Sequence, residues 1–308
     1  FDSEFGGAVL NCAINKYVYG LLKVRDDRRV HFASSDYRQS LIYNDIKNMK
    51  LDGQLDLIKA VVNRMNVNYG FELYIRSDVP PQSGLGSSAS TAIAAIGLFN
   101  HLSVEKKMTK SQIAELSYTI ETEDLKIKGG RQDQYAAVFG GIHLLEFFGN
   151  DFVKVNPVNL DKSVLNELER NIIVAYIGKR QNSGKVHSSR SAKSAATSYL
   201  QEMKQLGYES YYSLLRKDLI GFGSVLEKTW ELKKKVFKAS NAHIEKIYQA
   251  AKKAGAIGGR VTGAGGGGHI IFYCQIGKEW AVANAIQLLG AKILDFSFDH
   301  DGLQTWEI

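Results

Sequence analysis

The segment most able to do chemistry is a run of glycines and hydroxyl residues in the first third of the chain, Pro80-Pro81-Gln82-Ser83-Gly84-Leu85-Gly86-Ser87-Ser88-Ala89-Ser90. Glycines let a backbone approach a phosphate closely and turn its N–H groups towards it. The small residues from Ser87 onward predict a helix, whose N-terminal end attracts negative charge. The run therefore predicts a phosphate-binding loop, although a plain strand–turn–helix connection capped by serines would use the same residues.

Two other phosphate-binding motifs fit less well. No Gly-x4-Gly-Lys-[Ser/Thr] occurs in the chain, which excludes a P-loop. Residues Gly84–Ala89 match the dinucleotide pattern with alanine in third place, but no clean second strand ending in an acidic ribose ligand follows. Residues Gly263–Gly268 fit Gly-x-Gly-x-x-Gly but lead into His269–Cys274, which predicts a strand instead of a helix. A nicotinamide-dependent oxidoreductase is therefore a disfavoured alternative.

Two acidic residues between the glycine motifs are candidates for proton or metal chemistry. Glu121 lies on a predicted helix, and Asp133 follows a Gly-Gly-Arg-Gln sequence. An Asp within hydrogen-bond reach of a hydroxyl can accept its proton. Structural roles are also open at this point, because Glu121 has acidic neighbours on an exposed helix and Asp133 could be an N-cap.

The elements expected around these motifs are both strands and helices. Apolar or alternating runs predict strands at Ala8–Leu22, Phe71–Arg76, Ile142–Phe147, Ile172–Tyr176, His269–Cys274 and Ile293–Phe298. Helices are predicted at Leu55–Arg64, Ser87–Leu98, Gln132–Phe139 and Glu279–Leu289, and from a capping box at Thr109 and Gln112. The elements intermix without strict βαβ regularity, which favours an α+β fold over a doubly wound sheet.

Composition limits the class of protein and its partners. With 308 residues, 44% hydrophobic and 23% charged, the chain is typical of a globular protein with one large or two medium domains. No apolar run approaches the roughly 20 residues that span a bilayer, and the acidic start Phe1–Phe5 does not resemble a signal peptide. Two distant cysteines, expected to be buried, favour a reducing, cytoplasmic setting.

The net charge of +7 suits anionic small molecules. The densest basic cluster, Lys233–Lys235, lies in a helical segment and indicates a solvated face more than a nucleic-acid patch. We therefore expect phosphorylated ligands, with neither nucleic acid nor a membrane as partner. The sequence does not specify an oligomeric state.

Taken together, the two glycine motifs resemble those of the galactokinase–homoserine kinase–mevalonate kinase–phosphomevalonate kinase (GHMP) superfamily. Pro80–Ala89 is similar, nearly residue for residue, to its ATP-phosphate motif, and Val261–Gly268 to its C-terminal glycine-rich motif. The resemblance covers essentially the whole chain. It implies a two-domain α+β kinase that uses ATP and Mg²⁺, with a ribosomal-protein-S5-like domain over residues 1–165, a ferredoxin-like domain over residues 166–308, and ATP in the cleft.

The same resemblance implies roles for individual residues. Ser88 and Glu121 would bind Mg²⁺, and Asp133 would be the general base for direct in-line transfer of the γ-phosphoryl group. The implied ATP-binding residues are Pro81, Ser83, Gly84, Leu85, Gly86, Ser87, Ser88, Ala89, Gly263, Gly265 and Gly266. Mg²⁺ takes few protein oxygens together with substrate phosphates, which suits such a small ligand set.

Among the sugar kinases of the superfamily, residues Gly6–Tyr17 and Gly130–Ala137 look most like D-glycero-D-manno-heptose 7-phosphate kinases, and next most like fucokinase domains. This implies phosphorylation of the anomeric C1 hydroxyl to give a heptose 1,7-bisphosphate. Kinases for fucose or galactose are alternatives. A catalytically silent sugar sensor is another, disfavoured because Ser88, Glu121 and Asp133 are all present.

A substrate that already carries a phosphate needs a cationic pocket. The candidate residues are Lys179, Arg180, Lys185, His187 and Arg190, with Arg131 as a further substrate ligand. A solvated basic loop ahead of a helix is the alternative. Family members begin with a strand and a glycine-rich segment containing Gly-Thr-Asp. This sequence starts after that point, so we expect a preceding segment with sugar-binding residues.

Overall fold

The computed structural model describes residues 6–104, 107–149, 152–180, 193–237 and 239–308. The chain forms two compact units, both discontinuous in sequence. Unit 1 contains Phe1–Asn15, Gln82–Leu85 and Gly141–Asp299, and unit 2 contains Lys16–Pro81, Gly86–Gly140 and His300–Ile308. The phosphate-loop motif is thus divided between the units after Leu85. The proposed family domains, residues 1–165 and 166–308, are a different partition of the chain and stay a prediction.

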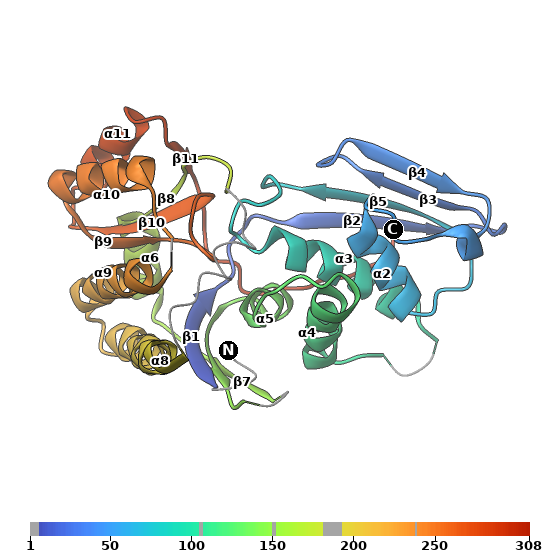
Figure 1. Cartoon of the computed structure of the whole chain (residues 1–308), viewed down its shortest axis with the longest axis horizontal. Coiled ribbons are helices and arrows are strands. Elements are labelled where there is room, and N and C mark those ends of the chain that lie inside the picture. The colour runs from blue at the N-terminus through green and yellow to red at the C-terminus, as the bar shows by residue number, and fades with distance from the viewer. Residues whose placement is uncertain (1–5, 105–106, 150–151, 181–192, 238) are drawn as a thin grey trace. The chain divides into compact units, whose positions relative to one another are not determined.

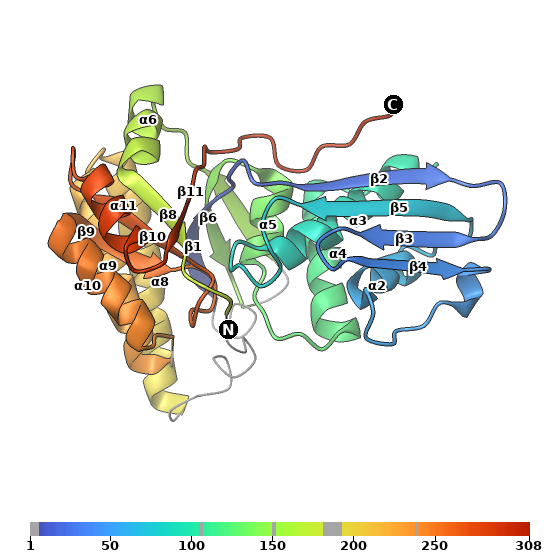
Figure 2. The ribbon, with the colours of Figure 1, turned by 90° about the horizontal axis from the view of Figure 1, so that it is seen from above.

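Unit 2 contains a four-stranded sheet in the order β2-β5-β3-β4 (Figure 2). Its strands are β2 (Val18–Val24), β5 (Phe71–Ser77), β3 (Val30–Ser34) and β4 (Gln39–Tyr43). The β3–β5 pair is parallel, and the other two pairs are antiparallel. Side chains alternate between the two faces of a strand, so β5 has one face of buried apolar residues and one of exposed polar residues.

The helices of unit 2 cover the buried face of this sheet (Figure 1). They are α2 (Asp56–Arg64), α3 (Ser87–Leu102), α4 (Lys110–Thr119) and α5 (Gln132–Phe139), with a 3-10 turn η1 (Ile46–Asn48) and a π-helical turn η2 (Ile120–Asp124) directly after α4. The buried ring of Phe71 on β5 contacts Phe99 on α3 edge-on, at a centroid distance of 5.1 Å. Aromatic packing of this kind holds α3 against the sheet.

Unit 1 contains two antiparallel sheets. The first has the order β1-β6-β7, formed by β1 (Gly7–Cys12), β6 (Ile142–Phe147) and β7 (Val153–Pro157). The second has the order β11-β8-β10-β9, formed by β11 (Lys292–Leu294), β8 (Ile172–Tyr176), β10 (His269–Cys274) and β9 (Ala256–Val261).

Helices pack on both faces of the second sheet, and the alternation of β10 shows how. They are α6 (Lys162–Asn171), α9 (Leu219–Val236), α10 (Ala242–Ala254) and α11 (Glu279–Gln287). Helix α8 (Lys193–Leu215) packs against α9 and β1. Phe272 packs in a core with Tyr248 of α10 and Ile286 of α11. Its neighbour Tyr273 packs in another core with Leu168 of α6 and Phe222 of α9. β10 is therefore buried on both faces, which explains its continuous apolar sequence.

The α+β class predicted from sequence is confirmed, and several elements agree residue for residue. These are β6, β8, β10 and α5, together with the capping box of Thr109 and Gln112 at the start of α4. The single strand predicted at Ala8–Leu22 is wrong, because the structure has two strands there in different sheets. The strand predicted at Ile293–Phe298 ends at Leu294, and strands β3, β4, β7 and β9 were not predicted.

Cys274 is buried as expected, whereas Cys12 is exposed, and both are free thiols. Within the described ranges, no helix combines the length and apolar character needed to cross a bilayer.

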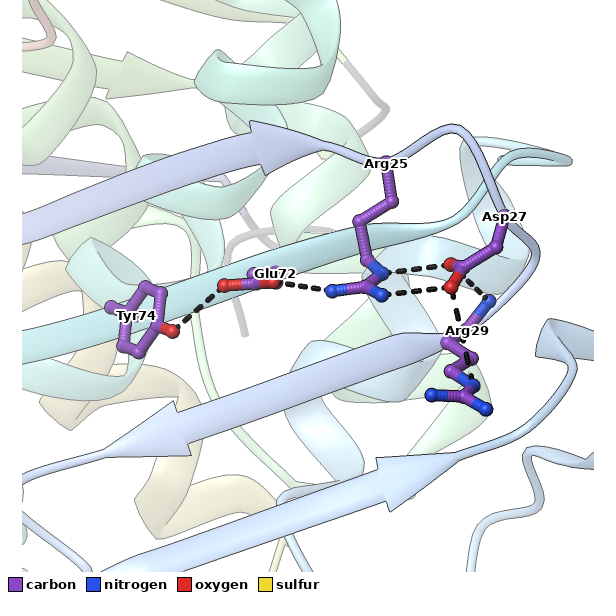
Figure 3. Close-up of polar contacts among 5 residues, drawn as sticks. All are labelled: Arg25, Asp27, Arg29, Glu72 and Tyr74. Carbon is purple, nitrogen blue, oxygen red and sulfur yellow. Dashed lines mark hydrogen bonds and ion pairs between the residues drawn. The ribbon is translucent and has the colours of Figure 1, made fainter.

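A network of ion pairs and hydrogen bonds lies at one end of the sheet of unit 2 (Figure 3). Arg25, after β2, donates to Asp27 through Nε and Nη2 at 2.7 Å each and to Glu72 on β5 through Nη1 at 2.5 Å. Glu72 also accepts from the hydroxyl of Tyr74 at 2.9 Å. The hydrogen bond from Arg25 lowers the pKa of Asp27 to about 2, and hydrogen bonds from Tyr74 and Arg25 lower the pKa of Glu72. The network ties the β2–β3 turn to the central strand.

We predict that Glu72→Gln lowers the melting temperature modestly at pH 7 and less at acidic pH. A carboxyl whose pKa is lowered in the folded state contributes stability above its ordinary pKa of 4.5, and this contribution is lost as the pH falls through the lower, folded value. Melting temperatures of wild type and variant measured from pH 7 to pH 3 should therefore converge. Glu202→Gln, at an exposed carboxylate of α8, is the control, and a gap that stays constant with pH would contradict the prediction.

Candidate active site

The phosphate-loop motif links β5 to α3 through two glycines in the left-handed region. Gly84 has φ of +80° and Gly86, the N-cap of α3, has φ of +72°, conformations that cost other residues more. Among the described residues, none of the backbone N–H groups of residues 83–89 donates a hydrogen bond. Ser83 is fully buried, and its hydroxyl has no partner within the described part of the chain. The loop thus offers donors without acceptors, as an anion-binding segment must.

In unit 1 this loop lies directly against the C-terminal glycine-rich motif. A side chain at Gly268 would overlap the carbonyl oxygen of Ser83, so only glycine fits. The next residue, His269, is buried and donates from Nδ1 to the same carbonyl at 2.8 Å. Burial lowers the pKa of His269, and the hydrogen bond to Ser83 opposes this shift. His269 therefore connects the two motifs through this hydrogen bond. The sequence analysis did not predict this role, although a histidine directly after a glycine run was a visible signal.

In unit 2 the two residues predicted to bind metal are in contact. The hydroxyl of Ser88, on the first turn of α3, donates to Oε1 of Glu121 at 2.5 Å. Oε2 of Glu121 accepts from Nε2 of Gln134 on α5 at 2.5 Å. Glu121, on the π-helical turn η2, is only 9% exposed, whereas Glu123 and Asp124 of the same turn point outward to Arg64. The exposed-carboxylate interpretation of Glu121 is therefore wrong.

The charge of Glu121 is not balanced by a cation of the described chain. Burial raises its pKa, hydrogen bonds from Ser88 and Gln134 oppose the shift, and the nearby charge of Asp133 raises it further. Glu121 forms no ion pair with any described residue. A buried carboxylate beside a second acid is a site that favours an added positive charge.

Asp133 lies beside the start of α3, in the same unit. A β-carbon at Gly86 would come within 3.3 Å of the Cβ of Asp133, and Oδ1 of Asp133 accepts from Nε2 of Gln132 at 3.1 Å. The N-cap of α5 is Arg131, and Asp133 is the second helical residue. The alternative interpretation of Asp133 as an N-cap is therefore wrong.

The other predicted substrate residues separate into three groups. Arg131 is 3% exposed, forms an ion pair with Glu115 at 2.9 Å and lies 4.0 Å from the ring centre of Tyr118, contacts that brace α5 on α4. Lys185, His187 and Arg190 lie outside the described residues. Lys179 and Arg180, which precede them, are described, and their side chains have different contacts.

Lys179 lines a cavity in unit 1 with a volume of about 400 Å³. Its wall includes Gly266 and Gly267 of the glycine-rich motif and His243 on the first turn of α10. Arg180 instead contacts the glycine-rich motif itself, since Nη2 donates to the carbonyl of Thr262 at 3.3 Å. Lys179 and Arg180 thus lie against different parts of the glycine-rich motif, and the cationic pocket stays a prediction.

Comparison with known proteins agrees with these motifs. Residues 56–141 match the family model of the GHMP kinase N-terminal domain, and residues 210–286 match that of the GHMP kinase C-terminal domain. The chain is 32% identical to the D-glycero-alpha-D-manno-heptose 7-phosphate kinase of Campylobacter jejuni, over all of this chain and 93% of that protein.

Solved structures give the same result for the fold. The chain is similar to a D-glycero-D-manno-heptose 1-phosphate kinase from Bacteroides thetaiotaomicron, with a TM-score of 0.84, 28% identity, and coverage of 100% of this chain and 92% of that one. It shares the fold of Lactococcus lactis galactokinase, with a TM-score of 0.76, 19% identity, and coverage of 98% and 89%. The 32% identity over the whole chain and the matches to both family models together show that this chain belongs to the GHMP kinase family.

Proposed function

We propose that this GHMP kinase transfers the γ-phosphoryl group of ATP, with Mg²⁺, to the C1 hydroxyl of D-glycero-D-manno-heptose 7-phosphate. The observation that carries the proposal is the cluster at the start of α3, where Ser88 contacts Glu121 and Asp133 lies beside Gly86. The heptose is supported by the two relatives whose names contain it. The C1 acceptor is taken from the resemblance described above.

The residues present fit a magnesium ion. Glu121 offers a buried carboxylate without a cation beside it, and Ser88 offers a hydroxyl oxygen at contact distance. Within the described residues there is no cluster of three or more His, Cys, Asp or Glu that could hold a metal. One carboxylate and one hydroxyl form a small ligand set that suits Mg²⁺, which is usually held by one or two protein oxygens and by substrate phosphates. Once bound, the ion neutralises charge on the transferring phosphoryl group.

The protein groups then have distinct tasks in our proposal. The N–H groups of residues 83–89 bind and orient phosphate oxygens, which supplies positioning and charge stabilisation. Asp133 accepts the proton of the sugar hydroxyl as its oxygen bonds to the γ-phosphorus, and the bond to the β-phosphate oxygen breaks to release ADP. The transfer is direct, so no phosphorylated side chain is needed.

The test of the proposed function is ADP release from ATP and Mg²⁺, with heptose 7-phosphate, fucose, galactose and mannose assayed in parallel. Selective turnover of heptose 7-phosphate is expected. Turnover of an unphosphorylated sugar alone would retain the kinase and reject the heptose assignment. Binding of ATP without turnover of any sugar would favour the silent sensor.

We predict that Asp133→Asn lowers kcat by roughly 10²–10⁴-fold, the usual contribution of a general base, and leaves ATP affinity near wild type. The amide keeps the shape of the side chain but cannot accept the proton. Steady-state kinetics and ATP titration check the two parts. Asp26→Asn, at an exposed position of the β2–β3 turn, is the matched control, and near-normal turnover of Asp133→Asn would refute the assignment.

We also predict that Glu121→Gln raises the Mg²⁺ concentration for half-maximal activity by at least about tenfold. The substitution removes the buried negative charge and keeps the volume of the side chain. Activity as a function of Mg²⁺ at fixed ATP measures the effect. Glu123→Gln, two residues away on the same turn but exposed, should titrate like the wild type; equal shifts in both variants would argue against a specific site at Glu121.

A further inference from the structure

Lys233 is a buried cation that the proposed mechanism does not use. It lies on α9, is 7% exposed, and donates from Nζ to the carbonyl oxygen of Gly263 in the glycine-rich motif. The adjacent Lys234 forms ion pairs with Glu231 at 2.8 Å and Glu245 at 3.3 Å. Lys233 forms no ion pair with any described residue. Burying an ammonium group without a counter-ion costs free energy, so an anion bound nearby would stabilise the charged form of Lys233.

The charged side chains that affect the pKa of Lys233 are also basic. Burial lowers its pKa, and the charges of Arg260 on β9 and Arg180 lower it further. Three basic side chains from α9, β9 and the segment after β8 therefore share one region of unit 1. A cluster of basic side chains favours an anion, and among the described residues Lys233 has no acidic partner that would supply the negative charge.

Arg180 places this cluster against both glycine motifs. Its Nη2 lies so close to Gly263 that a side chain there would overlap it, and a β-carbon at Gly84 would come within 2.9 Å of the same atom. Gly84 belongs to the phosphate-loop half that lies in unit 1. One guanidinium therefore contacts the two segments that the sequence predicts to bind phosphate.

The two cations also fix the direction of the loop peptides. Arg180 holds the carbonyl of Thr262 and Lys233 holds the carbonyl of Gly263. In a planar trans peptide the N–H points opposite to the carbonyl, so the N–H groups of Gly263 and Ala264 are directed away from the cations. Among the described residues, these two N–H groups have no acceptor.

We propose that Lys233 and Arg180 are positioning residues that aim the peptides of the glycine-rich motif at a bound phosphoryl group and supply positive charge behind it. The inference rests on the proposed function in one respect, that a phosphorylated ligand binds in unit 1. The phosphoryl group belongs either to ATP or to the sugar phosphate, and both present the same oxyanion chemistry.

The test compares Lys233→Met with Lys235→Met, the same change at an exposed position of the same helix. Each is titrated with ATP against adenosine, and with heptose 7-phosphate against the unphosphorylated heptose. We expect Lys233→Met to lose about tenfold or more in affinity for one phosphorylated ligand, the scale of a charge-assisted hydrogen bond, and to bind the matching unphosphorylated ligand as Lys235→Met does. The ligand that loses affinity identifies the source of the phosphoryl group.

If Lys233 has a purely structural role, Lys233→Met will lower the affinity for the phosphorylated and the unphosphorylated ligand of each pair equally, or will change only thermal stability. Either result overturns the inference. Arg180→Gln, at a partly exposed position, gives the same comparison if Lys233→Met does not fold. Because binding is measured without turnover, a protein that phosphorylates none of the sugars can still show Lys233-dependent ATP binding. Failure of the proposed function and failure of this inference are thus distinguishable.

Discussion

The carbonyl oxygen of Ser83 is the point on which the glycine motifs of unit 1 depend. It accepts a hydrogen bond from Nδ1 of His269 at 2.8 Å, and the backbone of Gly268 passes so close that no side chain would fit. Two segments separated by more than half of the chain are thereby fixed against each other. The contact needs glycine for the close approach and a buried histidine as the donor.

A different constraint governs unit 2. Glu121 is buried among Ser88, Gln134 and the charge of Asp133, without a cation of the described chain beside it. Burying a carboxylate in this way costs free energy unless a partner compensates. The π-helical turn that carries Glu121 is a rare form of helix often found at functional sites. Glu121 lies inward, while its acidic neighbours pair with Arg64 at the surface.

The two units show opposite electrostatics at the residues that resemble kinase motifs. Unit 2 has the buried Glu121 and the partly exposed Asp133 at the start of α3, whereas unit 1 has the buried Lys233 and the partly exposed Arg180 beside its glycine loops. The two environments suit different ligands, because a metal ion requires anionic ligands, whereas phosphate oxygens require hydrogen-bond donors and positive charge.

The sequence by itself determined the motifs and much of the local structure. Glycine spacing, capping residues and apolar runs predicted the phosphate loop, the start of α4, strands β8 and β10 and helix α5, because these depend on neighbours in the chain.

The tertiary structure decided which residues are buried and what they contact. Glu121 could not be told from Glu123 by pattern, Arg131 carried no mark of its partner Glu115, and Lys233 looked like one of three solvated lysines. The short strands β3 and β4 and the split of residues 8–22 between two sheets were also hidden. Strand β3 pairs with the distant β5, and β4 joins the sheet only through its hairpin partner β3. Burial and strand pairing are properties of the folded chain that local sequence does not encode.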